Sequence, residues 1–312
     1  MTAAVAERLR RGPVRTVVTV LFLGAAATGI FLALRSQGWE VLGTLTRADA
    51  VPYLLAAFGA AVLALVLGMV SWRALVVDLG PPLGTWASAR IFFVGMLGKY
   101  IPGRVWGLLA QVQMGRAAGV PGPVTTAAYL ISLVVVLLTG FAVGLLVAPS
   151  LLRGQAVWLA VPVALTIVVL ARPDLVNRCV TYLSVKARRP IETADATSSG
   201  LRRSIGAELA AWLVAGVHLW ALAALFGAPV LASLPVCVGG FALATSVGGL
   251  AIVLPDGWGA REVVLTLALA SVLPVGTAGV VAVASRLVNV VAELATIAVV
   301  VLMAKVAGGK GK

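Results

Sequence analysis

The sequence predicts an all-α integral membrane protein, and three observations support this fold class. Of the 312 residues, 61% are hydrophobic and only 11% are charged, whereas a soluble domain carries about 25% charged residues. The mean hydropathy is +1.07, and several apolar stretches approach the ~20 residues of a helix that crosses a bilayer. The two cysteines and one histidine are too few for a structural zinc site or a haem pair. We therefore expect no metal ion and no other cofactor.

Six apolar segments are expected to be full transmembrane helices. The first has no charged residue over 19 positions, about 28 Å of helix at ~1.5 Å per residue. The six segments are 16–34, 50–70, 124–147, 157–170, 205–226 and 278–303. Arginines precede the first one, so a cleaved secretory signal is the competing interpretation. The first apolar run is longer than the ~7–15 residues of a signal core, and further spans follow it.

Two further apolar stretches, 85–116 and 235–273, are broken near their middle by proline and glycine. The breaks contain Pro102 and Gly103 in the first stretch, and Pro255, Gly257 and Gly259 in the second. Proline removes a backbone donor and disfavours helix at the residue before it. Each stretch is therefore expected to be a helical hairpin, either re-entrant or crossing twice. The alternative is that both prolines are tolerated kinks in ordinary transmembrane helices.

The basic residues are distributed unevenly along this predicted topology. Sixteen of the 24 lysines and arginines fall on one side, three fall on the other, and five lie in the hairpins or the last span. The positive-inside rule then places both termini in the cytoplasm of a multi-pass protein of the plasma (inner) membrane. The surplus of positive charge is explained mostly by topology, so no nucleic-acid partner is expected. A basic surface beside a membrane instead meets anionic lipids.

The order of the segments indicates an inverted repeat. Residues 1–150 contain two spans, the hairpin 85–116 and one span; residues 151–312 repeat this order, with a basic cytoplasmic linker at 172–204 and the hairpin 235–273. Gly, Leu and Pro recur at matching offsets 153 residues apart, in 95–102 and 248–255. Because each unit crosses the membrane an odd number of times, the second unit is inverted. Inverted repeats with broken helices are typical of transporters.

Polar and aromatic side chains gather at both breaks and are the candidate substrate-binding residues. They are Lys99, Tyr100, Arg104 and Trp106 at the first break, and Trp258, Arg261 and Glu262 beside Asp256 at the second. Ionised groups in a bilayer are costly and are retained with partners or for a task. Lys99, Arg104 and Arg261 could form a phosphate clamp, helped by helix N-termini at the breaks. Alternatively, Lys99 and Arg104 extend to the lipid headgroups.

The last span carries a polar stripe that completes this set. Arg286, Asn289 and Glu293 share one helix face. Arg286 could pair with Glu262, and Glu293 could pair with Arg261. His218 could relay protons or, in the more ordinary case, form a hydrogen bond to a neighbouring helix.

Two stretches carry a resemblance to a known family. Residues 98–106, GKYIPGRVW, and 255–262, PDGWGARE, resemble the marker stretches of the lysylphosphatidylglycerol synthase transmembrane-region family. The resemblance implies a flippase-like membrane region. In the fused members this region is joined to a soluble aminoacyl-transfer domain. We expect no such domain within the 312 residues. The resemblance therefore implies the flippase-like part and not the synthase activity. The sequence departs from the family pattern at Asp256, where glycine is usual.

These features lead to one principal functional hypothesis and two alternatives. The principal hypothesis is a flippase- or scramblase-like transporter of an anionic lipid, a phospholipid or a polyprenyl-phosphate carrier. The first alternative is a non-transporting accessory or scaffold protein that holds a cell-envelope lipid or glycan enzyme as its partner. The second, an intramembrane transferase, ranks last because the sequence shows no catalytic nucleophile, metal site or nucleotide-binding motif. The protein is thus not expected to be an enzyme.

Overall fold

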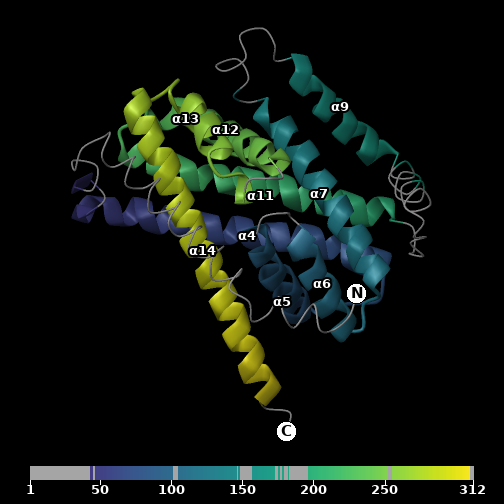
Figure 1. Ribbon diagram of the computed structural model, residues 1–312. Helices are drawn as coiled ribbons and strands as arrows, with labels where there is room; N and C mark the ends of the chain where they lie inside the picture. The colour runs from purple at the N-terminus through teal and green to yellow at the C-terminus, as the bar shows by residue number, and fades with distance from the viewer. Residues whose placement is uncertain are drawn as a thin grey trace.

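The computed structural model describes Gly43, Thr44, 46–100, 105–145, Val147, 157–172, Leu175, Arg178, Tyr182, 196–251 and 255–309, and its regular elements in these residues are all helices (Figure 1). This confirms the all-α fold class. The expected span 16–34, most of the linker 172–204, and Pro102, Gly103 and Arg104 lie outside the described residues.

The first half is built from a long helix, two short helices and a second long helix. The short 3-10 helix η1 (Ala48–Ala50) leads into α4 (Val51–Leu79), followed by α5 (Thr85–Met96), the 3-10 turn η2 (Leu97–Tyr100), α6 (Val105–Ala117) and α7 (Gly122–Gly144). Prolines lie in the first turns of α4 and α7, where the backbone N–H has no helical partner to lose. After α6 the chain turns at Gly119, whose φ of 82° is left-handed.

The second half repeats this order. After α9 (Val157–Ala171) come α11 (Ser198–Leu225), α12 (Val230–Leu250), the 3-10 turn η3 (Pro255–Gly257), α13 (Ala260–Leu269) and α14 (Val275–Gly309). Helix α11 begins at Thr197, whose hydroxyl accepts the backbone N–H of Gly200 at 3.1 Å. Helix α14 starts 153 residues after α7, which is the offset of the sequence match between the two breaks.

Five helices of the described chain are long and apolar enough to cross a membrane. Four of them, α4, α7, α11 and α14, correspond to expected spans, and the fifth is α12, Val230–Leu250. The sequence placed α12 in a hairpin limb that begins at 235, but the helix continues through Pro235 and reaches 21 residues. The expected span 157–170 is α9, a 15-residue helix of about 22 Å, short for a ~30 Å hydrocarbon core. The division into six spans and two re-entrant hairpins therefore stays a prediction.

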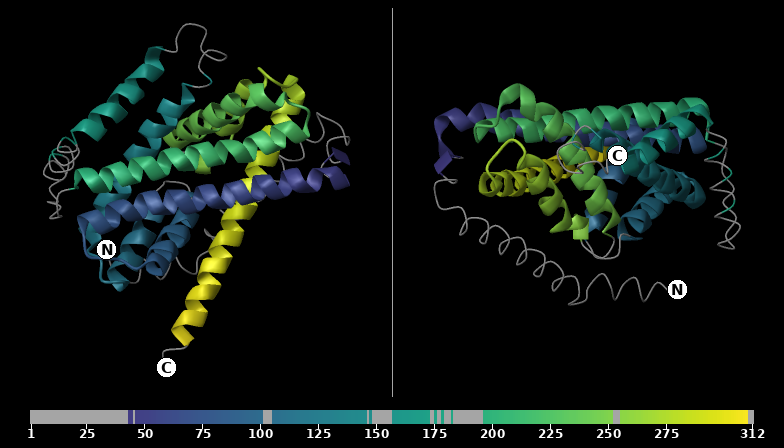
Figure 2. Two further views of the ribbon diagram at one scale, coloured as in Figure 1. Left: turned by 180° about the vertical axis from the view of Figure 1, so that it is seen from behind. Right: turned by 90° about the horizontal axis from the view of Figure 1, so that it is seen from above.

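Helices α4 and α11 pack side by side in opposite directions (Figures 1 and 2). The hydroxyl oxygens of Ser71 and Ser204 lie 3.0 Å apart. Two turns further along α4, Asp78 accepts hydrogen bonds from the backbone N–H and the hydroxyl of Thr197, both at 2.6 Å. The residue numbers rise along α4 as they fall along α11, so the two helices are antiparallel.

Both hairpins are closed by a contact between two glycines. A Cβ on Gly98 would lie 2.1 Å from the backbone nitrogen of Gly107, and one on Gly257 would lie 2.4 Å from the Cα of Gly248. The helices are interrupted near both prolines, because η2 ends at Tyr100 and α12 ends at Leu250, before Pro255 in η3. The absence of side chains at these glycines lets the chain fold back tightly.

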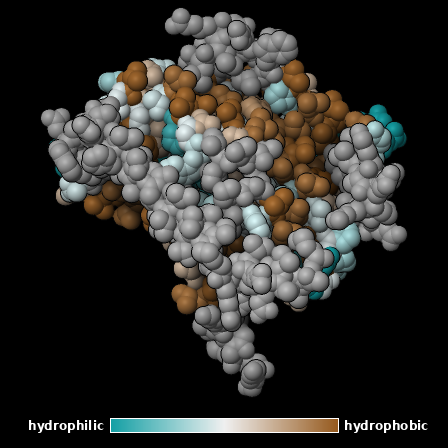
Figure 3. Space-filling model, viewed as in Figure 1, coloured by the Kyte–Doolittle hydropathy of each residue, from teal (hydrophilic) through white to brown (hydrophobic). Residues whose placement is uncertain are grey.

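The surface of the described chain carries many exposed apolar side chains. Hydrophobic residues form broad areas in the view of Figure 3, and Leu231, Val275 and Leu55 are 87%, 68% and 66% exposed. Contiguous apolar surface of this kind is expected to face lipid. Together with the five apolar helices, it supports a multi-pass membrane protein.

Candidate functional site

The two helix breaks, 153 residues apart in sequence, meet in the structure. The turns η2 and η3 are in contact, and the Lys99 ammonium lies 3.6 Å from a carboxylate oxygen of Asp256. Each break therefore supplies one charge to the other.

Helix α14 joins both breaks into one charged cluster. Lys99 binds the Glu293 carboxylate at 2.5 Å, and the Tyr100 hydroxyl donates to the same carboxylate. Arg286, on the same face of α14 about two turns before Glu293, binds Asp256 at 2.9 Å and Glu262 at 3.3 Å. The stripe on α14 is thus fully engaged, with Glu293 holding the first break and Arg286 holding the second.

The backbone of the second break explains how Asp256 reaches both cations. Its φ of 48° is left-handed, a conformation that glycine adopts readily and other residues rarely adopt. The side chain of Asp256 places a carboxylate between Lys99 and Arg286.

Arg261 is buried and differs from the other two cations. Its guanidinium lies over the Phe241 ring, 4.6 Å from the centroid, and its Nη2 is buried with no hydrogen-bond partner in the described chain. Among the described residues no carboxylate lies within ion-pair distance of it, so the expected Arg261–Glu293 pair is not formed, whereas the expected Arg286–Glu262 pair is. The N-terminus of α13 is occupied by its own side chain, because Glu262 accepts the backbone N–H of Gly259 at 2.7 Å.

His218 belongs to a hydrogen-bonded core and not to the charged cluster. Its Nδ1 donates to the Ala215 carbonyl, which fixes the proton on that nitrogen because a carbonyl can only accept. Its Nε2 faces the Ser285 hydroxyl at 2.8 Å and the Asn289 amide at 3.0 Å. The ordinary interpretation of a histidine bonded to a neighbouring helix is confirmed, and Asn289 serves the same contact.

A polar cavity of about 220 Å³ lies beside the cluster. Lys99 and Asp256 line it, together with Trp72, Gln111, Tyr129 and Ser132 from three helices of the first half. A cation, an anion and neutral polar side chains therefore line this cavity, which lies next to the contact between η2 and η3.

The structure brings together most of the residues selected from the sequence. Seven of them lie at or against the cluster: Lys99, Tyr100, Trp258, Arg261, Glu262, Arg286 and Glu293. The Arg286 guanidinium lies 5.5 Å from the centroid of the Trp258 ring. Trp106 is exposed at the start of α6, and Arg104 lies outside the described residues. Among the described histidine, cysteine and carboxylate side chains, no group of three could hold a metal ion.

Sequence reasoning missed several buried polar residues. Gln111 and Trp72 line the cavity, and Glu208 is buried on α11. A single acidic residue within an apolar span was the available signal for Glu208. The sequence carried no comparable signal for Gln111 and Trp72, since only the tertiary fold places them beside Lys99.

Apolar helices, two helix breaks and a buried charged cluster where the breaks meet define a polytopic helical membrane protein. The chain belongs to the family described as the lysylphosphatidylglycerol synthase TM region, whose sequence profile matches residues 16–296 of the 312. The family membership expected from the two marker stretches is thereby confirmed. A comparison with curated proteins finds no match.

Proposed function

We propose that this protein moves an anionic lipid, a phospholipid or a polyprenyl-phosphate carrier, between the leaflets of the plasma membrane. The observation that carries the proposal is the meeting of two interrupted hairpins, one from each half, at a charged cluster beside a cavity. Broken helices in inverted halves are typical of transporters with one central site. The antiparallel packing of α4 and α11 supports the inversion, because equivalent helices of inverted halves run in opposite directions.

The headgroup would enter the polar cavity while the hydrocarbon chains remain in the bilayer. Lys99 and Arg286 are already bound to carboxylates, whereas Arg261 forms no ion pair among the described residues and has an unsatisfied Nη2. A phosphate oxygen would satisfy that group and gain a charge-assisted hydrogen bond. Arg261 does not line the cavity, so in this proposal it binds the phosphate once the two breaks separate, with Lys99, which lines the cavity, and Arg104 completing the clamp.

Movement of the headgroup requires the two breaks to separate and rejoin. Lys99 has two carboxylate partners, Glu293 at 2.5 Å and Asp256 at 3.6 Å. An ammonium is a compact charge on a flexible stem, so Lys99 could exchange one partner for the other, or for a phosphate, without being left unpaired. This exchange would let the hairpins shift without an uncompensated buried charge, which is costly.

The proposal is tested with purified protein in vesicles that contain a fluorescent phosphatidylglycerol, whose exposure in the outer leaflet is followed by chemical quenching. Arg261→Gln should abolish the protein-dependent movement. The matched control is Arg90→Gln, which removes an exposed arginine from α5 and should leave the movement unchanged.

Both variants must retain the wild-type elution profile and a cooperative thermal transition. Unchanged movement in folded Arg261→Gln would refute the phosphate ligand. No movement with the wild-type protein alone would refute the transport proposal and favour the accessory role.

A further inference from the structure

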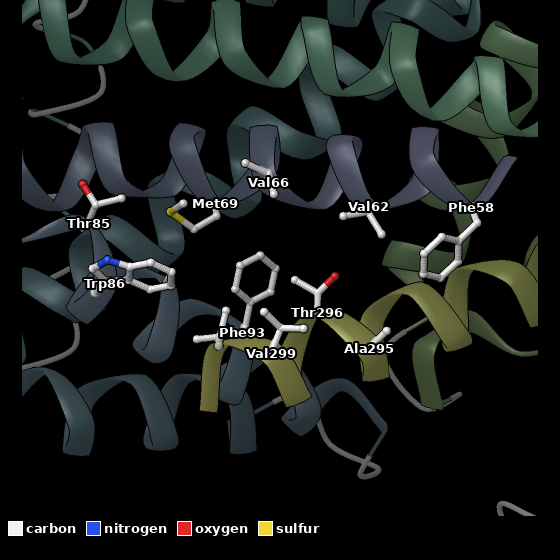
Figure 4. A pocket seen from close by; sticks show the side chains of 12 residues that line it. Phe58, Val62, Val66, Met69, Thr85, Trp86, Phe93, Ala295, Thr296 and Val299 are labelled. Atoms are coloured by element: carbon white, nitrogen blue, oxygen red, sulfur yellow. The ribbon is translucent and has the colours of Figure 1, made fainter. Parts of the chain in front are cut away.

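An apolar groove lies between α4, α5 and α14 (Figure 4). Its volume is about 440 Å³, within the ~300–1,000 Å³ of ligand pockets. Phe58, Val66 and Met69 of α4 face Phe93 of α5 and Val299 of α14, and Trp86 lies at one end. We call this space the chain groove.

The chain groove offers no polar interaction to an occupant along most of its length. Its lining contains two hydroxyls, and that of Thr296 already donates to the Ala292 carbonyl of its own helix at 2.7 Å. In the hydrocarbon region no water is available to fill a space of this kind. The natural occupant is therefore hydrocarbon.

The dimensions select a single hydrocarbon chain over a protein helix. A helix with side chains is about 10–12 Å wide, too wide for a groove of 440 Å³ that follows α4 from Phe58 to Met69, a distance of about 16 Å. Helix α4 is a candidate span, so a chain in the groove would lie along the direction of the neighbouring lipid chains.

The chain groove and the headgroup site have no lining residue in common, but both lie along the same two stretches of the chain. On α14, Thr296 lines the groove and follows Glu293 of the cluster by about 4.5 Å along the axis. Phe93 of α5 also lines the groove, six residues before Lys99 in the adjoining turn η2. One lipid could therefore contact both sites.

We propose that the chain groove binds one acyl or isoprenoid chain of the lipid whose headgroup occupies the polar cavity. The inference rests on the proposed function for the headgroup, but the groove can be tested without a transport measurement. It assigns α4, α5 and α14 a direct role in holding the apolar part of the substrate.

The test uses the full-length protein in vesicles of phosphatidylcholine and phosphatidylglycerol, with a photoactivatable group at the end of one acyl chain of the phosphatidylglycerol. After illumination, the labelled residues are mapped by mass spectrometry. Labels should concentrate in 58–69 and 295–300, above the level on the exposed apolar residues Val263 and Leu267 of α13.

Filling the chain groove should remove this excess. Ala295→Phe places a ring in the groove, whereas Ala298→Phe adds the same ring to an exposed position of the same helix outside the lining. Val66→Phe repeats the first change from α4. The two groove variants should lose the excess labelling, and Ala298→Phe should keep it.

Uniform labelling of all exposed apolar faces, or unchanged labelling in both folded groove variants, would overturn the inference. Should either groove variant fail to fold, the other and the wild-type distribution of labels decide. Concentrated labelling without lipid movement would uphold the groove and refute transport. Lipid movement without concentrated labelling would do the reverse.

Discussion

Replacing Lys99 with methionine should destabilise the protein more than replacing Glu293 with glutamine. The side chain of Glu293 is 6% exposed and that of Lys99 is 27% exposed. Without Lys99, the more deeply buried carboxylate keeps only the Tyr100 hydroxyl. Without the Glu293 charge, Lys99 keeps Asp256 at 3.6 Å, and a glutamine oxygen can still accept from Tyr100.

The magnitudes follow from this difference in burial. Breaking a buried pair costs about 3–5 kcal/mol; because Lys99 is partly exposed, we expect Lys99→Met to lose about 2–3 kcal/mol. In Glu293→Gln the hydrogen bond from Tyr100 goes to a neutral acceptor and the one from Lys99 is lost, because an amide nitrogen cannot accept; we expect a loss of about 1–2 kcal/mol. In the double variant neither charge remains, so the total loss should fall short of the sum by about 1–2 kcal/mol.

The free energies of unfolding are measured by reversible denaturant titration in detergent micelles, with tryptophan fluorescence as the signal. The control is Arg90→Met, which removes an exposed cation from α5. It should change the free energy of unfolding by less than about 0.5 kcal/mol. Additive single effects, or a larger loss from Glu293→Gln than from Lys99→Met, would refute the reasoning.

The first hairpin and the membrane orientation give two more predictions. Gly98→Ala would place a Cβ 2.1 Å from the Gly107 nitrogen, so it should lower the free energy of unfolding by about 1–3 kcal/mol. The control Gly59→Ala adds a Cβ that meets nothing within 4 Å and should be neutral or stabilising. Equal thermal midpoints of the two variants would contradict the close contact. In a variant lacking Cys179 and Cys237, a cysteine replacing Ser198 should react with an impermeant thiol reagent only after cells are opened, and one replacing Leu231 in intact cells, because the basic residues place the start of α11 in the cytoplasm. The opposite pattern of labelling would reverse the orientation of both halves.

The sequence predicted the fold class, the positions of both breaks and most members of the cluster, because residues that are unfavourable in a transmembrane helix stand out in an apolar sequence. Charges and prolines inside apolar stretches are visible without a structure. The ion pairs within the cluster were harder to predict. Glu293 was expected to bind Arg261, but it binds Lys99 instead. The spacing of residues along α14 determines which of them share a helix face. The partner of Glu293 depends instead on how the first hairpin packs against α14, and its Lys99 lies 194 residues earlier in the sequence. The length of α12 was also underestimated, since Pro235 lies inside the helix without ending it.

The contact between Lys99 and Glu293 also constrains how the protein is made. Lys99 and Tyr100 belong to the first half, yet the carboxylates described as binding them, Asp256 and Glu293, come from the second half. While the ribosome is still translating α11 and α12, the first hairpin carries an ammonium group with neither of these counterions. Because an unpaired charge is costly in hydrocarbon, the tip of this hairpin should remain near water or headgroups until α14 has emerged. Helix α14, which is translated long after the first hairpin, would then complete the insertion of that hairpin.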